Sequence, residues 1–223
     1  MLDRVGNVFF ALTGSNTTDR LDAINTEISP VLSAHYDSIT LNPALFQRVK
    51  AVYDNRAAMA MTAEDATLLE NTYEGMVHAG AMLTDAQREQ VKAINTQLST
   101  ITTELGQKVR SAMTDQPLVV DTREELFKLS YHRADGQLAV DTRPLIAEIA
   151  ALRAEKAALF GAPDWATYAM WDRMAENPET ALGFMGQMVP ALAATQRREA
   201  ALLNEVIAAS GENFEVQPWD WYR

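Results

Sequence analysis

Residues 84–109 read TDAQREQVKAINTQLSTITTELGQKV, and this stretch decides the fold. Thr84 and Gln87 have the spacing of a capping box, which marks the start of a helix. After this start, apolar residues recur at steps of three and four positions: Val91, Ile94, Leu98, Ile101, Leu105 and Val109. This spacing places their side chains on one stripe of an amphipathic helix of about seven turns. Such a stripe must pack against a partner helix.

Two further segments carry a similar apolar stripe. The first consists of Leu145, Ile149, Leu152 and Leu159, and the second of Leu182, Met185, Val189, Leu192, Leu203 and Val206. More helices are expected near residues 2–13, 17–37, 43–56, 62–80, 123–132 and 163–174. The sequence therefore predicts an all-α fold, a multi-helix bundle with long antiparallel helices.

Several helix ends have chemical markers. Asn42-Pro43 and Asn177-Pro178 each place a capping side chain before a proline at the first helical position. Asp141 is predicted to cap the helix that follows it. Gly161, with Pro163 close behind, predicts the end of that helix.

The domain boundary is expected in the turn-rich stretch 114–122. The single β-like run, PLVVD at 117–121, is too short and isolated to build a sheet. The stretch separates a predicted N-terminal helical lobe, residues 1–113, from a C-terminal helical lobe, residues 123–223.

Composition excludes several classes of partner. The 223 residues include 30 acidic and 19 basic side chains, a net charge of −11, which repels nucleic acid and anionic membranes. No apolar run approaches the roughly 18 residues that a spanning helix needs, and no basic region precedes the short apolar stretch near the N-terminus. The chain has no cysteine, which rules out disulfides and agrees with a cytoplasmic location, our expectation.

Metal binding has one weak candidate in the sequence. The three histidines, His35, His78 and His132, form no H-E-x-x-H or other paired metal-binding spacing. Glu70, Glu74 and His78 align along one helix face at successive steps of four residues. Metal sites in helical bundles instead use Glu-x-x-His with carboxylates from facing helices, so we interpret this face as a solvated polar surface.

Other catalytic patterns are also missing. The sequence has no G-x-S-x-G elbow and no glycine-rich phosphate loop. The carboxylate pairs Glu64-Asp65 and Glu124-Glu125 lie beside helix starts, where they favour the helix dipole rather than acid–base chemistry. Residue chemistry alone thus predicts no catalytic, cofactor-binding or metal-binding residue in this chain.

A family resemblance rests on five stretches. They are RVGNVFFALTGSNT (4–17), LNPALFQRVKAVYDNR (41–56), LLENTYEGMVHAGAMLTDAQREQVKAINTQLSTITTELGQKV (68–109), DTRPLIAEIAALRAEKAALFGAPDWATYAMWDRMAENPETAL (141–182) and FEVQPWDWYR (214–223). With these stretches the sequence resembles the thimet-oligopeptidase-like zinc metallopeptidases, and most of all their bacterial peptidyl-dipeptidase (dipeptidyl carboxypeptidase) branch. The five stretches occur in the same order in that family and cover most of the chain.

The resemblance implies the N-terminal helical part of a neurolysin-like fold. In the family this region forms walls of a deep channel that admits short unstructured peptides, and zinc is bound elsewhere, by an H-E-F-G-H sequence and a downstream glutamate. Two histidines one helical turn apart can face one metal ion while the glutamate between them activates its water. No position here matches that motif, so no catalytic or zinc-binding residue transfers, and a separate catalytic part is the implied partner.

Three departures from the family accompany the resemblance. Relatives have a further helical segment before this N-terminus, and several tens of additional residues between TTELGQKV and DTRPLIAEI. Their pattern also continues as a helix beyond Arg223. We therefore expect a fragment that is inactive by itself, with either an internal deletion or a gap in the sequence between TTELGQKV and DTRPLIAEI.

Two alternative functions remain open at this point. A truncated relative would serve as a stand-alone helical module that binds peptides or a protein through Trp219, Trp221 and Tyr222. An unrelated bundle would use the Glu70, Glu74 and His78 face as a metal site. In the favoured interpretation the two tryptophans are core residues, which either fold back onto apolar helix faces or are poorly ordered.

Overall fold

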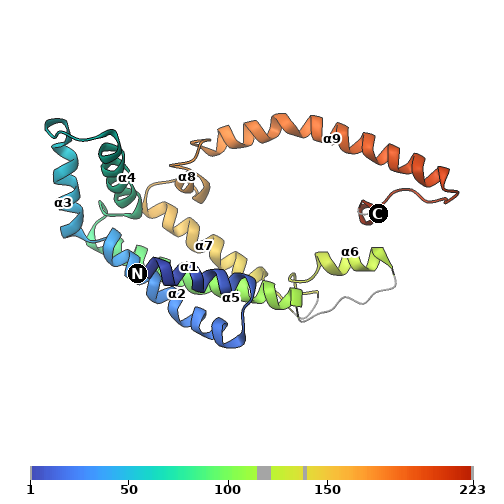
Figure 1. Ribbon diagram of the computed structural model, residues 1–223, viewed down its shortest axis with the longest axis horizontal. Coiled ribbons are helices and arrows are strands. Elements are labelled where there is room, and N and C mark those ends of the chain that lie inside the picture. Colours follow the sequence, from blue (N-terminus) through green and yellow to red (C-terminus); the bar gives the residue numbers. More distant parts are fainter. Residues whose placement is uncertain (1, 115–121, 138–139, 222–223) are drawn as a thin grey trace. The chain divides into compact units, whose positions relative to one another are not determined.

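The computed structural model describes residues 2–114, 122–137 and 140–221 (Figure 1). Within these ranges the regular structure is helical, which confirms the all-α prediction. The α-helices are α1 (Leu2–Ser15), α2 (Asp19–Thr40), α3 (Pro43–Asp54), α4 (Ala63–Ala79), α5 (Asp85–Thr114), α6 (Arg123–Tyr131), α7 (Arg143–Leu159), α8 (Trp165–Ala169) and α9 (Pro178–Ala209). Two short 3-10 helices, η1 (Arg56–Ala58) and η2 (Pro218–Asp220), accompany them.

The chain forms two compact units. The first unit comprises residues 1–110 and 142–161, and the second comprises residues 111–141 and 162–223. The lobes expected at 1–113 and 123–223 stay a prediction. Most of the connecting stretch 114–122, with PLVVD, lies outside the described residues.

The predicted helix starts are confirmed by hydrogen bonds. Gln87 N–H donates to Thr84 Oγ1 at 3.3 Å, and Thr84 N–H donates to Gln87 Oε1 at 3.1 Å, which completes the capping box of α5. The Asn42 and Asn177 side chains accept from backbone N–H groups in the first turns of α3 and α9. Local chemistry therefore sets these boundaries.

Two predicted boundaries were wrong. Asp141 does not cap α7, because its backbone forms an antiparallel bridge with Asp135 and the N-cap residue is Thr142. The helix expected at 163–174 shortens to α8, because the backbone N–H groups of Arg173 and Glu176 bond to carbonyls three residues back in turns. The predicted stop is confirmed, since Gly161 has a left-handed φ of 70° just after α7.

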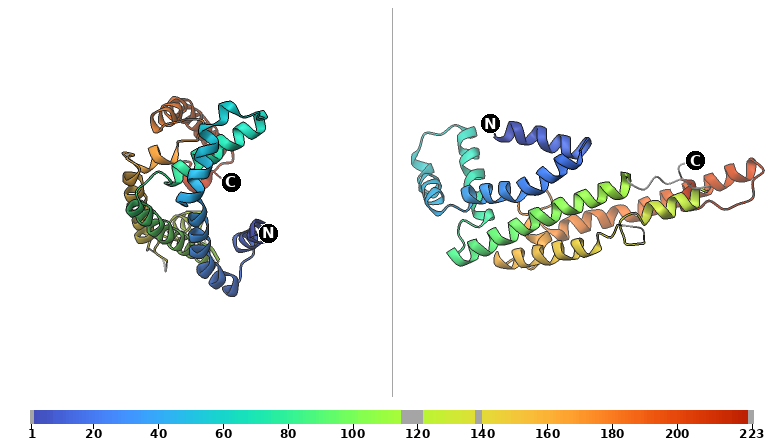
Figure 2. Two further views of the ribbon diagram at one scale, coloured as in Figure 1. Left: turned by 90° about the vertical axis from the view of Figure 1, so that its left-hand side faces the viewer. Right: turned by 90° about the horizontal axis from the view of Figure 1, so that it is seen from below.

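The core of the first unit lies between α5 and α7. Figures 1 and 2 show these helices side by side and running in opposite directions. The predicted stripes of both helices meet there. Ile94, Ile101, Ile149 and Leu152 are buried, and the partly buried Leu98, Leu105, Leu145 and Leu159 pack around them.

A helical hairpin of α3 and α4 forms a second cluster in the first unit. Phe46, Met76 and Ala81 are buried there, and the Tyr73 ring stacks on Tyr53 with a centroid separation of 4.0 Å. Gly80 ends α4 with a φ of 116°. A side chain at Gly80 would meet Leu83 at 3.0 Å, so glycine is needed for both the conformation and the space.

In the second unit the tryptophans fold back onto helices, as predicted. The Trp219 ring packs edge-on against Phe127 of α6, with centroids 6.0 Å apart. Trp221 lines a hollow with Leu202, Leu203 and Val206 of α9. Tyr222, which was grouped with them, lies outside the described residues.

Charged groups strengthen the same contact. Asp220, 4% exposed, accepts from Gln217 N–H at 3.1 Å and pairs with Arg123 of α6 at 3.0 Å. Asn204 of α9 accepts from Val216 N–H at 2.8 Å. The segment 216–221 thus contacts both α6 and α9.

The apolar stripe of α9 forms a helix but is largely uncovered within the described residues. Leu182 is 64% exposed and Leu192 is 63% exposed. No helix in the described part of the chain has the length and hydropathy needed to cross a membrane.

Replacing Ile94 with alanine tests the α5–α7 core. Ile94 is 3% exposed, so Ile94→Ala should lower the free energy of unfolding by about 2–5 kcal/mol, through lost burial and the cavity left behind. Gln97→Ala, on the exposed side of α5, is the matched control and should stay within about 0.5 kcal/mol of the parent. Urea unfolding followed by circular dichroism measures both. Equal losses in the two variants would contradict this packing.

Candidate functional site

A partly buried polar network links three helices of the first unit. Asn95 of α5 donates from Nδ2 to Asp37 Oδ1 of α2 at 2.8 Å. Its Oδ1 accepts from Lys156 Nζ of α7 at 2.6 Å. Asn95 therefore joins a carboxyl group and an ammonium group that belong to different helices.

Burial dominates the electrostatics of this network. Asp37 is 8% exposed, and its Oδ2 atom has no hydrogen-bond partner within the described residues. Burial raises the pKa of Asp37, although the Asn95 hydrogen bond and the nearby Lys156 and Lys92 charges oppose the shift. Burial also lowers the pKa of Lys156, against the attraction of Asp37. In both side chains the fold penalises the charged form.

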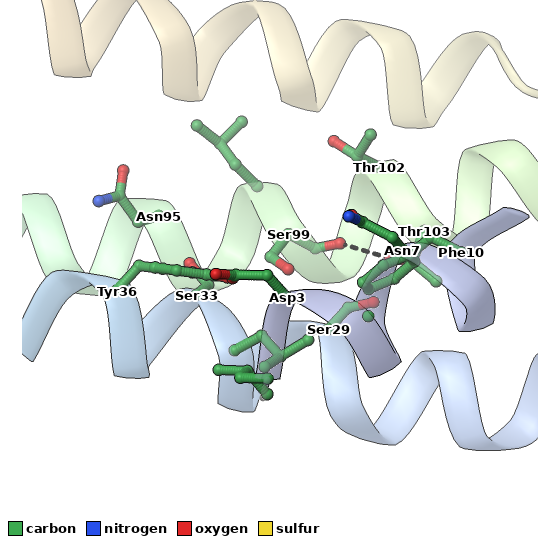
Figure 3. Close-up of a pocket in the computed structure, with 14 residues that line it drawn as sticks. Asp3, Asn7, Phe10, Ser29, Ser33, Tyr36, Asn95, Ser99, Thr102 and Thr103 are labelled. Carbon is green, nitrogen blue, oxygen red and sulfur yellow. Dashed lines mark hydrogen bonds between the residues drawn. The ribbon is translucent and has the colours of Figure 1, made fainter.

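An open cleft of about 530 Å³ lies beside the network, between α1, α2 and α5. Asn95 belongs to both features. Figure 3 shows Tyr36 of α2 extending toward Asp3 of α1, across from the side chains of α5. The Tyr36 hydroxyl lies 3.5 Å from Asp3 Oδ1, a long contact.

The cleft combines apolar and uncharged polar walls. Leu2, Phe10, Leu32 and Leu98 contribute apolar surface, and six side chains contribute hydroxyl groups. Among the described residues that line the cleft, Asp3 is the one ionisable group with a formal charge near neutral pH, and there is no lysine, arginine or histidine. This chemistry can bind and orient a ligand, and it offers no activated nucleophile or general base.

Little in the amino-acid sequence indicates this network. Asp37 and Asn95 are 58 positions apart, and Asn95 and Lys156 are 61 apart, so no short motif contains them. One signal was present. Asn95 lies four residues after Val91 and next to Ile94, which places a polar amide at the edge of the buried stripe.

The helix face that carries Glu70, Glu74 and His78 is more exposed than the network of Asp37, Asn95 and Lys156. Both glutamates are exposed, and the His78 ring lies 6.3 Å from the Phe160 ring. Among the described residues, no group of three or more histidine, aspartate or glutamate side chains is arranged to hold a metal ion.

The carboxylate pairs occupy first turns of helices. Asp65 completes a capping box with Thr62 at the start of α4. Glu125 N–H donates to Thr122 Oγ1 at 3.2 Å, and Glu124 pairs with Lys128. These contacts agree with the interpretation that the pairs stabilise helix starts.

Comparison with known proteins shows that the chain is similar in sequence to peptidases. Residues 118–223 match Peptidase family M3. Over 99% of its length, the chain is 31% identical to the dipeptidyl carboxypeptidase of Escherichia coli (strain K12) and 29% identical to that of Salmonella typhimurium (strain LT2). Over 44% of its length it is 33% identical to oligopeptidase A of Salmonella typhimurium.

These matches confirm the resemblance seen in the sequence. Residues 118–223 are similar to the family M3 peptidases. Within that class it is similar to bacterial dipeptidyl carboxypeptidases along nearly its whole length. The chain spans about 40% of the length of those two relatives.

The alignment also bears on the expected internal deletion. It extends over 270 positions, whereas the chain has 223 residues, so the Escherichia coli relative has at least 47 residues there that this chain lacks. This difference in length agrees with the expected shortening by several tens of residues. Its location between residues 109 and 141 stays a prediction.

Replacing Asp37 with asparagine tests the electrostatics of the network. A carboxyl group whose pKa is raised by folding stabilises the protein while protonated. Its contribution is present below the ordinary value of 3.8 and is lost as the pH rises through the raised value. The free energy of unfolding of the parent, relative to Asp37→Asn, should therefore fall as the pH rises from about 3.8 through the raised pKa of Asp37.

Urea unfolding at each pH measures this difference. Asp19→Asn, which alters an exposed carboxylate of α2, is the matched control. A difference that grows with pH would mean that attraction between Asp37 and Lys156 outweighs burial.

Proposed function

We propose that this chain forms the helical channel wall of a zinc metallopeptidase that hydrolyses short peptides and releases dipeptides from their C-termini. The observation that supports the proposal is the similarity to dipeptidyl carboxypeptidases over 99% of the chain. A wall must hold its shape while peptides pass. The packed α5–α7 core and the Asp37, Asn95 and Lys156 network supply that rigidity.

The zinc site of such an enzyme does not fit the residues of this chain. Peptidases of this kind need two histidines one helical turn apart, and no H-E-x-x-H sequence occurs in the 223 residues. Glu70, Glu74 and His78 do not replace it, because both glutamates are exposed and their spacing along one helix cannot surround an ion. We therefore assign zinc binding and water activation to residues outside this sequence.

A hydrolysis assay tests this division of roles. The purified 223-residue chain with added zinc should not cleave a blocked tripeptide above the buffer rate, because it has no H-E-x-x-H motif to activate water. Chromatography of the products measures the cleavage, and Escherichia coli dipeptidyl carboxypeptidase is the positive control. Zinc-dependent cleavage by the chain alone would overturn the assignment.

The reading frame past codon 223 provides a second test. An H-E-x-x-H sequence encoded further along the same frame is the expected result. A stop codon directly after Arg223 would instead favour the stand-alone helical binding module.

A further inference from the structure

We propose that the cleft between α1, α2 and α5 binds the amino-terminal end of a short extended peptide. Asp3 would receive the α-amino group, the hydroxyl and amide side chains would bond the peptide backbone, and the apolar wall would take a side chain. The inference deepens the proposed function and rests on it for the choice of peptides as the ligand. It concerns binding by this chain and requires no zinc.

The charge of the cleft selects the kind of ligand. Within the described part of the chain, Asp3 is its one charged side chain, and no cationic side chain lines it. A carboxylate or phosphate would be placed beside a like charge without a compensating partner. A protonated amine gains a favourable contact with Asp3, which is exposed and accessible.

The hydroxyl groups of the cleft suit an extended backbone. Thr103 Oγ1 donates to the Ser99 carbonyl within α5. Ser33, Ser99 and Thr102 make no such bond in the part of the chain that the structure describes, so their hydroxyls remain for a ligand. An extended peptide carries unpaired N–H and C=O groups that need these partners, whereas a docking helix has bonded its own.

Asn95 is oriented before any ligand arrives. Its Oδ1 atom accepts from Lys156 and one Nδ2 hydrogen is donated to Asp37, which distinguishes the two ends of the amide. The second Nδ2 hydrogen has no acceptor among the described residues, and in the proposal it donates to a peptide carbonyl. Lys156 and Asp37 are thus positioning residues for Asn95.

The size of the cleft agrees with a short peptide. Its volume of about 530 Å³ falls within the range of about 300–1,000 Å³ that is usual for small-ligand sites. Phe10, Leu32 and Leu98 provide enough apolar surface for one large side chain.

Calorimetric titration of the full 223-residue chain tests the proposal. The probes are Ala-Phe-Ala amide with a free amino group and the same peptide acetylated at that group. The free-amine peptide should bind about two- to fivefold more tightly, the range expected for an exposed charge pair. Asp3→Asn should remove this preference and leave the affinity for the acetylated peptide unchanged.

A second set of variants tests the location. Ser99→Trp fills the cleft from α5 and should weaken binding at least about tenfold, because it occupies the space that the peptide needs. Gln97→Trp adds the same side chain on the exposed side of α5 and should bind like the parent. Ser33→Trp blocks the cleft from α2, and circular dichroism shows whether each variant is folded.

Peptide affinity also tests whether Lys156 orients Asn95. Lys156→Met should weaken binding of both peptides equally, because Asn95 loses its orienting donor, and Lys156→Arg should restore it. A merely structural role would lower the unfolding midpoint of Lys156→Met without changing peptide affinity in the folded protein.

Three results would overturn the inference. The first is that the parent chain binds neither peptide. The second is that Ser99→Trp and Ser33→Trp bind the free-amine peptide as tightly as the parent does. The third is that the parent binds the free-amine and the acetylated peptide with equal affinity. None of these depends on the zinc assay, so failure of the cleft and failure of the proposed function are distinguishable.

Discussion

The packing of α5 against α7 is the constraint on which the first unit depends. Ile94 and Ile101 meet Ile149 and Leu152 in a buried seam, although these pairs of residues are about fifty positions apart in the chain. Burial of such side chains is the main favourable contribution to folding, at about 1.5–3 kcal/mol each. The seam also sets where the polar side chains at its edge can lie.

The polar network of Asp37, Asn95 and Lys156 is a consequence of that seam. Once α5 and α7 pack, Asn95 and Lys156 lie close enough for a 2.6 Å hydrogen bond, and α2 adds Asp37 from the third side. A network of this kind contributes little stability unless its members are satisfied, but it strongly disfavours other registers of the helices. We interpret it as a device that holds α2, and with it the wall of the cleft, in a defined position.

The second unit uses a different means to bind its helices. Trp219 packs on α6, Trp221 reaches α9, and the buried Asp220 pairs with Arg123. Aromatic side chains bury a large area with few rotatable bonds, so a short segment can hold two helices. The stripe of α9 around Leu182 and Leu192 has no comparable cover within the described residues.

The sequence by itself determined the helices and most of their ends, because capping and periodicity act within a few residues. It also supported the family, since ordered matches need no coordinates. Asp141 was misassigned because a backbone bridge to Asp135 competes with capping, and no local pattern records that pairing. Only the tertiary structure brought Asp37, Asn95 and Lys156 together and formed the cleft beside Asp3, because both arise from contacts between helices that are distant in the chain.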